Sequence, residues 1–441
     1  MSTVFEKYHS LLDKTDPIKF TGRVVKVQGL LIESHGPRAV LGELCYIIMN
    51  NTNIPVWAEV VSLRQDTIQL MAYDSFEGIE IGNPVVATGR SLEVPVSPVM
   101  LGRVLDGMGR PCDDRGNIRS ASRIPVFNSP PDLLKRKPIT DQIQTGVRAI
   151  DSLLAVGKGQ RIGIFSGAGV GKSTLLGMIA RNTNADINVI ALVGERGREV
   201  TEFIENELGP EGMKKSVIVV SSSNTPPISR IRGAYTATAI AEYFRERGKD
   251  VMLFFDSLTR FARAQREVGL AIGEPPATRG YTPSVFTEMP KLLERCANSA
   301  KGTMTGFYTV LVEGDDLDEP VADNAEGFLD GHIILSRKMA EANHYPAIDV
   351  LKSISRIAGK ILPEDIKTSA GYIKNRMAVF NEAEDLINVG AYVKGSNPDI
   401  DESIKKLPDI RKFLIQPVEE KAALEDSFSA LTKITGIKGK E

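Results

Sequence analysis

A glycine-rich stretch at residues 161–174, RIGIFSGAGVGKST, limits the possible folds of this chain more strongly than any other part. The apolar run 161–165 predicts a buried strand, the glycines predict a tight loop, and the following LLGMIAR is compatible with a helix. This order is the context that a P-loop requires, because N–H groups at the start of a helix then face an anion. The stretch therefore predicts an α/β domain with a phosphate-binding loop.

The residue types in this loop suit contacts with a nucleoside triphosphate. Lys172 would reach the β- and γ-phosphates, and the Ser173 hydroxyl would hold Mg²⁺. The strict motif has glycine where this chain has Ser166, which we interpret as a variant because a small residue can still form the corner. The alternative is a glycine-rich turn without a ligand. The predicted nucleotide-binding residues of the loop are Gly167, Ala168, Gly169, Val170, Gly171, Lys172, Ser173 and Thr174.

Composition excludes several other classes of protein. The net charge of −2 over 441 residues gives no field that would attract nucleic acid or an anionic membrane. Cys45, Cys112 and Cys296 lack metal-ligand spacing, and their odd number favours a reducing compartment. The first ten residues lack the apolar core of a signal peptide, and no apolar run is long enough to span a membrane. We expect a cytoplasmic protein that does not bind nucleic acid.

Hydrophobic patterning divides the chain into four parts. Residues 1–20 are either one amphipathic helix or a frayed terminus, and short β-branched runs in 21–95 are typical of a small β-barrel. In 96–360, a Gly- and Pro-rich connecting stretch up to about residue 144 precedes apolar strands that alternate with helices, which predicts a parallel sheet covered on both faces. Residues 361–441 are polar and helix-rich. The predicted strands of the sheet are 161–165, 187–193, 217–220, 251–255, 303–312 and 332–335, with a helix at 228–244.

Two carboxylates follow predicted strands of this sheet. Asp256 ends the apolar run VMLFF, as a Walker B aspartate does when it holds Mg²⁺ through water; the alternative is a helix N-cap. Glu195 follows INVIALV, and the carboxyl ends of parallel strands meet at one edge of a sheet. We predict that Glu195 orients the attacking water, the alternative being a surface glutamate paired with Arg196 or Arg198.

Two residues later in the chain are further candidates for nucleotide contacts. A cation facing the γ-phosphate would stabilise the transition state, and Arg356 suits this role, although spacing does not separate it from Arg337 or Arg260. Tyr345 in HYPAID could stack on adenine or lie in a core.

Taken in order, these stretches resemble the family of rotary ATP synthases and protein-export ATPases. The similarity runs from about residue 20 to 435, and several stretches are most similar to the flagellar branch of the type III export ATPases. Motifs that recur in register over hundreds of residues are far more specific than a lone P-loop. The stretches are GRVLDGMGRP, TGVRAIDSLLAVGKGQRIGIFSGAGVGKSTLLGMIAR, GERGREV, DSLTRFARAQREVGLAIGEPPATRGYTPSVF, HYPAIDVLKSISR and EDLINVGAY.

The resemblance implies a β-barrel, a RecA-like nucleotide-binding domain and a C-terminal helical domain, in a six-membered ring with ATP and Mg²⁺ between neighbours. Lys172 and Ser173 match the family's phosphate and Mg²⁺ ligands, and Asp256 matches its Walker B carboxylate. Glu195 matches the catalytic carboxylate of the GER motif, and Arg196 its phosphate-contacting arginine.

Two further residues match contacts that lie beside the nucleotide in this family. Arg356, in SISR, matches the arginine finger given to the next subunit's site, and Tyr345 matches the aromatic beside adenine. The stretch FLIQPVEEKAAL lacks the synthase's second adenine-side aromatic.

The resemblance also implies partners and a location. It implies a regulator that binds residues 1–20, a central stalk protein, a membrane export gate and chaperone–substrate complexes. Hydrolysis would move the C-terminal domains and assist release and unfolding of exported substrates. The protein would be cytoplasmic and peripherally associated with the membrane export apparatus.

Several alternatives share this core. One alternative is a non-catalytic ring subunit, but such subunits usually lack the carboxylate that Glu195 supplies. Another alternative is a catalytic subunit of a rotary ATP synthase. An RNA-translocating helicase needs basic and stacking groups in its barrel, but residues 22–92 are only lightly basic and contain one tryptophan, Trp57. The ATPase of a virulence (injectisome) secretion system shares nearly every motif. Two segments favour the flagellar type, the linker SPPDLLKRKPI and the pattern RxRGxxxA at residues 230–237.

Overall fold

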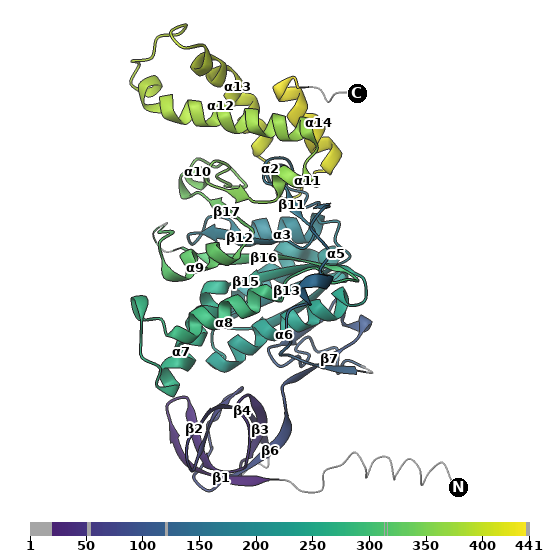
Figure 1. The fold of residues 1–441 in the computed structure, drawn as a ribbon, viewed down its shortest axis with the longest axis vertical. Helices are drawn as coiled ribbons and strands as arrows, with labels where there is room; N and C mark the ends of the chain where they lie inside the picture. Colours follow the sequence, from purple (N-terminus) through teal and green to yellow (C-terminus); the bar gives the residue numbers. More distant parts are fainter. Residues whose placement is uncertain (1–19, 51–53, 120–121, 313, 315, 438–441) are drawn as a thin grey trace, which may run out of the picture.

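The computed structural model describes residues 20–50, 54–119, 122–312, 314 and 316–437. They form three parts stacked along the long axis: a β-barrel, a sheet flanked by helices, and a helical end (Figure 1). The predicted fold class is confirmed in all three parts. The predicted N-terminal segment lies outside the described residues apart from Phe20.

The barrel has six antiparallel strands that close in the order β1-β2-β5-β4-β3-β6. Alternate side chains point inward, so Val24, Ile32 and Leu70 fill the interior and are almost completely buried. The strands are β1 (Thr21–Gln28), β2 (Leu31–His35), β3 (Glu43–Ile48), β4 (Pro55–Leu63), β5 (Ile68–Ala72) and β6 (Pro84–Ser91).

The central sheet runs in the order β18-β17-β12-β16-β15-β13-β14-β8, and its pairs are parallel except β17–β18. The six predicted strands are confirmed to within one residue at each end, because an apolar run buried on both faces is a strong signal. The strands are β8 (Val104–Asp106), β12 (Arg161–Ser166), β13 (Ile187–Val193), β14 (Ser216–Ser221), β15 (Asp250–Asp256), β16 (Thr303–Leu311), β17 (Gly331–Leu335) and β18 (Ile354–Ser355).

Helices cover both faces of this sheet. Helices α2 and α3 pack on one face, and α6 to α9 pack on the other (Figure 1). The helix predicted at 228–244 is α6. The helices are α2 (Arg148–Leu153), α3 (Lys172–Asn182), α4 (Gly197–Glu202), the π-helical η3 (Phe203–Leu208), α5 (Gly209–Lys214), α6 (Pro227–Arg245), α7 (Leu258–Ile272), α8 (Pro283–Glu294), α9 (Pro320–Phe328), α10 (Arg337–Glu341) and α11 (Ala358–Ile361).

The connecting stretch before residue 144 contains more structure than its Gly and Pro content predicts. Strand β8 lies within it and joins the edge of the sheet beside β14. The prediction of a connecting stretch without strands of the sheet is therefore wrong for these residues. Three residues are too few to show a period in sequence, and β8 is recognisable only because β14 supplies its partner. The other short elements are β7 (Glu93–Val96), β9 (Ser122–Pro125), β10 (Gln142–Ile143), β11 (Val156–Gly157), η1 (Pro98–Met100), η2 (Leu133–Lys135) and η4 (Thr278–Gly280).

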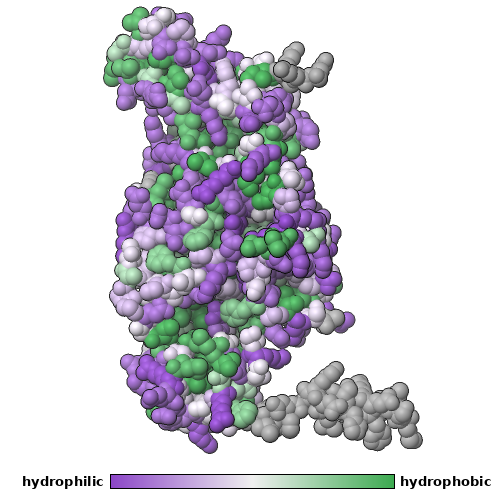
Figure 2. Space-filling view, viewed as in Figure 1, coloured by the Kyte–Doolittle hydropathy of each residue, from purple (hydrophilic) through white to green (hydrophobic). Residues whose placement is uncertain are grey.

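The C-terminal part consists of α12 (Glu364–Asn388), α13 (Pro398–Leu414) and α14 (Leu424–Thr435). It is bonded to α2 because the Arg148 guanidinium donates to the carbonyls of Phe413 and Ile415 at 3.0 and 2.6 Å. Hydrophilic and hydrophobic side chains are interspersed on the face of the molecule seen in Figure 2. Among the described helices, none has an apolar stretch sufficient to cross a bilayer.

A buried ion pair joins the barrel to the central part. Glu59 on β4 accepts hydrogen bonds from Nε of Arg232 on α6 at 2.7 Å and from the Tyr73 hydroxyl at 2.5 Å. Nη2 of Arg232 donates to the other oxygen of Glu59. The Arg232 guanidinium also lies over the Phe127 ring, 4.6 Å from its centroid. These contacts fix the barrel against α6.

Candidate active site

The loop between β12 and α3 has the backbone that its glycines predict. Gly169 and Gly171 have φ of +75° and +92°, in the left-handed region that favours glycine. Helix α3 begins at Lys172, so its first N–H groups face the loop. Ser166 is buried as the last residue of β12, where strands β16 and β17 pair with it on both sides. A serine therefore fits at this corner as part of the strand.

Lys172 lies between the two predicted carboxylates. Its Nζ is 2.5 Å from Oδ1 of Asp256 and 3.7 Å from Oε1 of Glu195. The carboxylates come from the carboxyl ends of the neighbouring strands β15 and β13, and they are only 3% and 6% exposed. Two buried carboxylates need a counter-charge, which Lys172 supplies in part. A triphosphate in the loop would compete with them for this lysine.

Arg260, which entered the sequence-based prediction only as an alternative to Arg356, clamps Glu195. Nη2 of Arg260 donates to Oε2 of Glu195 at 3.0 Å, and Nη1 donates to the Gly194 carbonyl at 2.8 Å. Nε lies 2.9 Å from Oε1, but neither atom has an aligned hydrogen bond among the described residues. The available signal was Ser257, which caps α7 directly after β15 and places Arg260 one turn along.

The environment of Glu195 gives it a greater affinity for a proton than an exposed glutamate has. Burial raises its pKa to about 8, with further contributions from the charge of Asp256 and a hydrogen bond with Glu199. The same hydrogen bond lowers the pKa of Glu199. A carboxyl group whose pKa lies near neutrality is suited to exchange a proton with water.

Ser173 and Asp256 are oxygen donors of the kind that Mg²⁺ takes beside a nucleotide. The described residues contain no cluster of three or more His, Cys, Asp or Glu side chains that could hold a metal by themselves. Mg²⁺ usually takes one or two carboxylates together with phosphate oxygens and waters. Ser173 is exposed in the first turn of α3, and Asp256 lies beside Lys172. This donor set fits a metal ion that arrives with the nucleotide.

The rest of the predicted loop residues differ in accessibility. Ala168 and Gly169 are exposed, whereas Gly167 and Val170 are buried. The Thr174 hydroxyl donates to Glu207 of η3 at 2.9 Å and so binds the next helix along the chain.

Arg196 does not join the Lys172 group in this structure. Its side chain is 76% exposed, and its Nη1 lies 3.4 Å from Oε1 of Glu199. Its backbone caps α4, and Glu199 completes a capping box with it. The guanidinium predicted to contact phosphate thus points into solvent at the rim of the site.

Tyr345 lies beside the phosphate loop, as its predicted role requires. A Cβ built on Gly171 would stand 3.5 Å from Cε1 of the Tyr345 ring. Tyr345 is 39% exposed as a residue, and its carbonyl accepts a hydrogen bond from the backbone N–H of Gln416 at 2.9 Å. The aromatic residue therefore links the rim of the loop to the C-terminal part.

Arg356 lies at the amino end of β17, whereas the phosphate loop lies at the carboxyl ends of the strands. Ser355 pairs with Gly331 at the start of β17, and the Arg356 N–H donates to the Asp330 carbonyl at 3.1 Å. Strand β17 is parallel to β12, and at ~3.3 Å per residue its length separates this end from the phosphate loop by roughly 16 Å. The guanidinium is exposed, and it donates to the Glu326 carbonyl at 3.5 Å. Arg356 and the loop of one protomer are not brought together.

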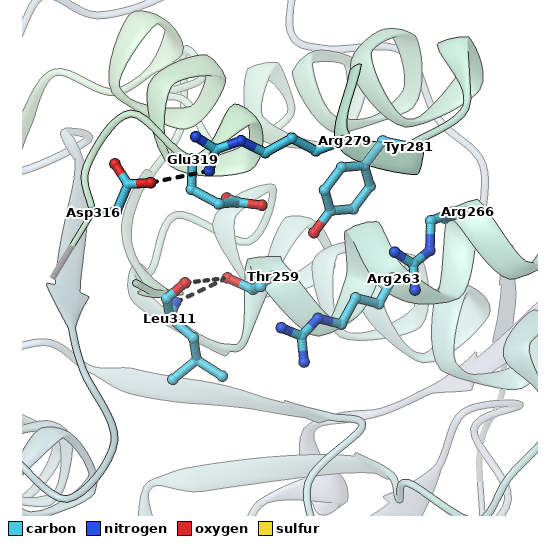
Figure 3. A pocket seen from close by; sticks show the side chains of 8 residues that line it. All are labelled: Thr259, Arg263, Arg266, Arg279, Tyr281, Leu311, Asp316 and Glu319. Carbon is cyan, nitrogen blue, oxygen red and sulfur yellow. Dashed lines mark hydrogen bonds and ion pairs between the residues drawn. The ribbon is translucent and has the colours of Figure 1, made fainter. Parts of the chain in front are cut away.

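Two cavities open at the carboxyl ends of the strands, on the side of the phosphate loop. One of 220 Å³ borders the loop at Ser166 and Gly167. The other, of 480 Å³, lies beyond α7, where arginine side chains surround Tyr281 and Arg279 pairs with Asp316 at 3.0 Å (Figure 3). No predicted site residue lines this second cavity; its lining consists of Thr259, Arg263, Arg266, Arg279, Tyr281, Leu311, Asp316 and Glu319.

Family models match three consecutive parts of the chain. Residues 24–89 match the beta-barrel domain of the ATP synthase alpha/beta family, and residues 146–355 match its nucleotide-binding domain. Residues 362–433 match the T3SS EscN ATPase C-terminal domain. The three matches follow the three parts of the fold.

Relatives are similar over nearly the whole chain. The flagellum-specific ATP synthase of Treponema pallidum (strain Nichols) is 54% identical over 431 residues, covering 98% of this chain and 96% of that protein. The flagellum-specific ATP synthase of Bacillus subtilis (strain 168) is 51% identical, with coverage of 98% and 99%. A type 3 secretion system ATPase of Xanthomonas euvesicatoria is 48% identical, with coverage of 94% of both chains.

Solved structures of type III secretion ATPases have the same fold as this chain. The assembled ATPase EscN from the enteropathogenic E. coli type III secretion system has a TM-score of 0.89 and 41% identity, covering 94% of this chain and 99% of that chain. EscN in complex with its central stalk EscO has a TM-score of 0.87 and 40% identity with the same coverage. The chain belongs to the ATP synthase alpha/beta family, among its flagellum-specific and type III secretion ATPases.

Proposed function

We propose that this P-loop ATPase hydrolyses Mg-ATP to assist protein export by the flagellar type III apparatus, in which exported substrates leave their chaperones and unfold. The observation that carries the chemistry is the buried group of Lys172, Asp256 and Glu195 beside the glycine-rich loop, with Nζ of Lys172 2.5 Å from Asp256. The flagellar assignment rests on relatives such as the flagellum-specific ATP synthase of Treponema pallidum, which is 54% identical over 98% of the chain.

The residues of the site divide the work of hydrolysis. Residues 167–174 bind the phosphates through backbone N–H groups, with Lys172 on the β- and γ-phosphates. Mg²⁺, held by Ser173 and through water by Asp256, would neutralise phosphate charge when bound. Glu195 orients the attacking water and accepts its proton, and Arg260 keeps the Glu195 carboxylate in place.

Three residues complete the site from its rim and from a neighbouring subunit. Tyr345 stacks on the adenine, and Arg196 turns from solvent to the γ-phosphate. Arg356 acts in trans, because roughly 16 Å of sheet separate it from the loop of its own protomer. An arginine in this role contributes about 10³–10⁵ in rate. The function therefore requires a homo-oligomeric ring, which we propose to be a hexamer.

The partners follow from the same family membership. EscN was solved with its central stalk EscO, which supports a stalk partner for this ring as well. We also propose a regulator that binds residues 1–20, a membrane export gate and chaperone–substrate complexes. The protein would work in the cytoplasm, peripherally attached to the export apparatus. Flagellar rather than needle-complex genes beside its own gene would support the flagellar system over a virulence system.

Mixed rings test the placement of Arg356. Neither Arg356→Ala nor Lys172→Ala subunits alone should hydrolyse ATP at a significant rate. In rings mixed at equal amounts, about one interface in four pairs an intact loop with an intact Arg356, since a head-to-tail ring contact uses two different surfaces. We expect the ATPase rate to recover to about a quarter of wild type on that count. Verified mixed rings without recovery, or full activity of Arg356→Ala alone, would contradict the placement.

A further inference from the structure

Thr309 lies directly behind the Asp256 carboxylate. Its Oγ1 donates to Oδ1 of Asp256 at 2.7 Å, whereas the Phe255 carbonyl is 3.4 Å away. Thr309 is completely buried, and its strand β16 is paired on one side with β12 and on the other with β15. A β-branched side chain inside such a sheet has little rotamer freedom. The hydroxyl therefore stands at a fixed position relative to Asp256.

The two oxygens of Asp256 are used differently. Oδ1 accepts from both Thr309 and Lys172, at 2.7 and 2.5 Å. Among the described residues, Oδ2 receives no hydrogen bond. When a triphosphate draws Lys172 away, Thr309 is the donor that remains on Oδ1. The carboxylate then keeps its orientation, and Oδ2 stays free of a hydrogen bond from the described residues.

We infer that Thr309 is a positioning residue, which fixes the Asp256 carboxylate for the Mg²⁺ of the bound nucleotide. The inference rests on the proposed function, because it assigns Asp256 to that metal ion. Hydrogen bonds that orient a metal-binding side chain typically contribute 10–100-fold to metal affinity. Thr309 would act through this bond without touching nucleotide or metal.

The test is a titration of MgCl₂ at a fixed concentration of a fluorescent, non-hydrolysable ATP analogue, read as binding and not as turnover. Thr309→Val keeps the branched shape and removes the hydroxyl, and Thr309→Ser keeps the hydroxyl. We expect Thr309→Val to raise the half-saturating Mg²⁺ concentration about tenfold, with Mg²⁺-free binding unchanged, and Thr309→Ser to stay within about twofold of wild type. If Thr309→Val fails to fold, Thr309→Ala replaces it.

Two outcomes would overturn the inference. One is a Thr309→Val curve that coincides with wild type. The other is an equal shift in the Val and Ser variants, since packing and not the hydroxyl would then be responsible. A wild-type protein whose nucleotide binding does not depend on Mg²⁺ at all would instead count against the proposed function.

Discussion

Two arginine–glutamate pairs, one at the active site and one at the barrel seam, have similar geometry but different surroundings. Arg232 and Glu59 at the seam are joined by two hydrogen bonds, and the Tyr73 hydroxyl supplies a third. Burial opposes the charge of Arg232, yet the adjacent Glu59 raises its pKa above the ordinary value. The seam pair is thus complete in itself.

The pair at the active site is incomplete by comparison. Oε1 of Glu195 has no aligned hydrogen bond among the described residues, although Arg260 lies 2.9 Å away. A second buried carboxylate, Asp256, stands close enough to raise the pKa of Glu195. The comparison teaches that a saturated buried carboxylate holds parts together, whereas an unsaturated one beside another acid is available for a substrate.

The largest expected effect separates the two glutamates by activity. Glu195→Gln should lower the ATPase rate by about 10²–10⁴-fold, because an amide cannot accept the proton of the attacking water. Binding of Mg-ATP, measured with a fluorescent analogue, should remain. Thermal stability without nucleotide should not fall, since the repulsion from Asp256 is removed. A near-normal rate would remove Glu195 from this role.

The next effect concerns the seam and should appear in stability. Glu59→Gln leaves the largely buried Arg232 charge without its partner, which should lower the free energy of unfolding by about 3 kcal/mol in urea titrations. ATPase activity per folded molecule should stay within about twofold of wild type. The matched control is the double variant Glu59→Met/Arg232→Met, which should recover most of the loss. If Glu59→Gln lost as much ATPase activity as Glu195→Gln, the seam pair could not be described as purely structural.

The smallest effect is a pH dependence that belongs to the active-site pair alone. The folded protein binds a proton at Glu195 more tightly than the unfolded chain does. The contribution of Glu195 to the free energy of unfolding is therefore present at low pH and is lost as the pH rises from 4.5 to about 8. Burial raises the pKa of Asp151 to about 7, so this residue titrates in the same pH window. Comparison with Glu195→Gln separates the effect of Glu195 from that of Asp151. The melting temperature of the wild type should fall by about 2 °C more than that of the variant across this window. Parallel curves would show that Glu195 ionises normally.

The sequence alone was sufficient where a few consecutive residues carry the signal. Apolar runs located the six strands, and the glycines with Lys172 located the phosphate loop, because backbone conformation and burial are set by local residue types. Asp256 was recognisable because it directly follows such a run, and Glu195 because only Gly194 separates it from one. The resemblance of the motifs then indicated the family that the relatives confirm.

Tertiary structure decided which side chains meet. Strand order placed β15 beside β13, which brought Arg260 onto Glu195, and it left only β16 between β15 and β12, which brought Asp256 within 2.5 Å of Lys172. Both pairs lie far apart in the chain. It also put Arg356 at the amino end of β17. Such contacts depend on strand order and side-chain direction, which no local stretch of sequence encodes.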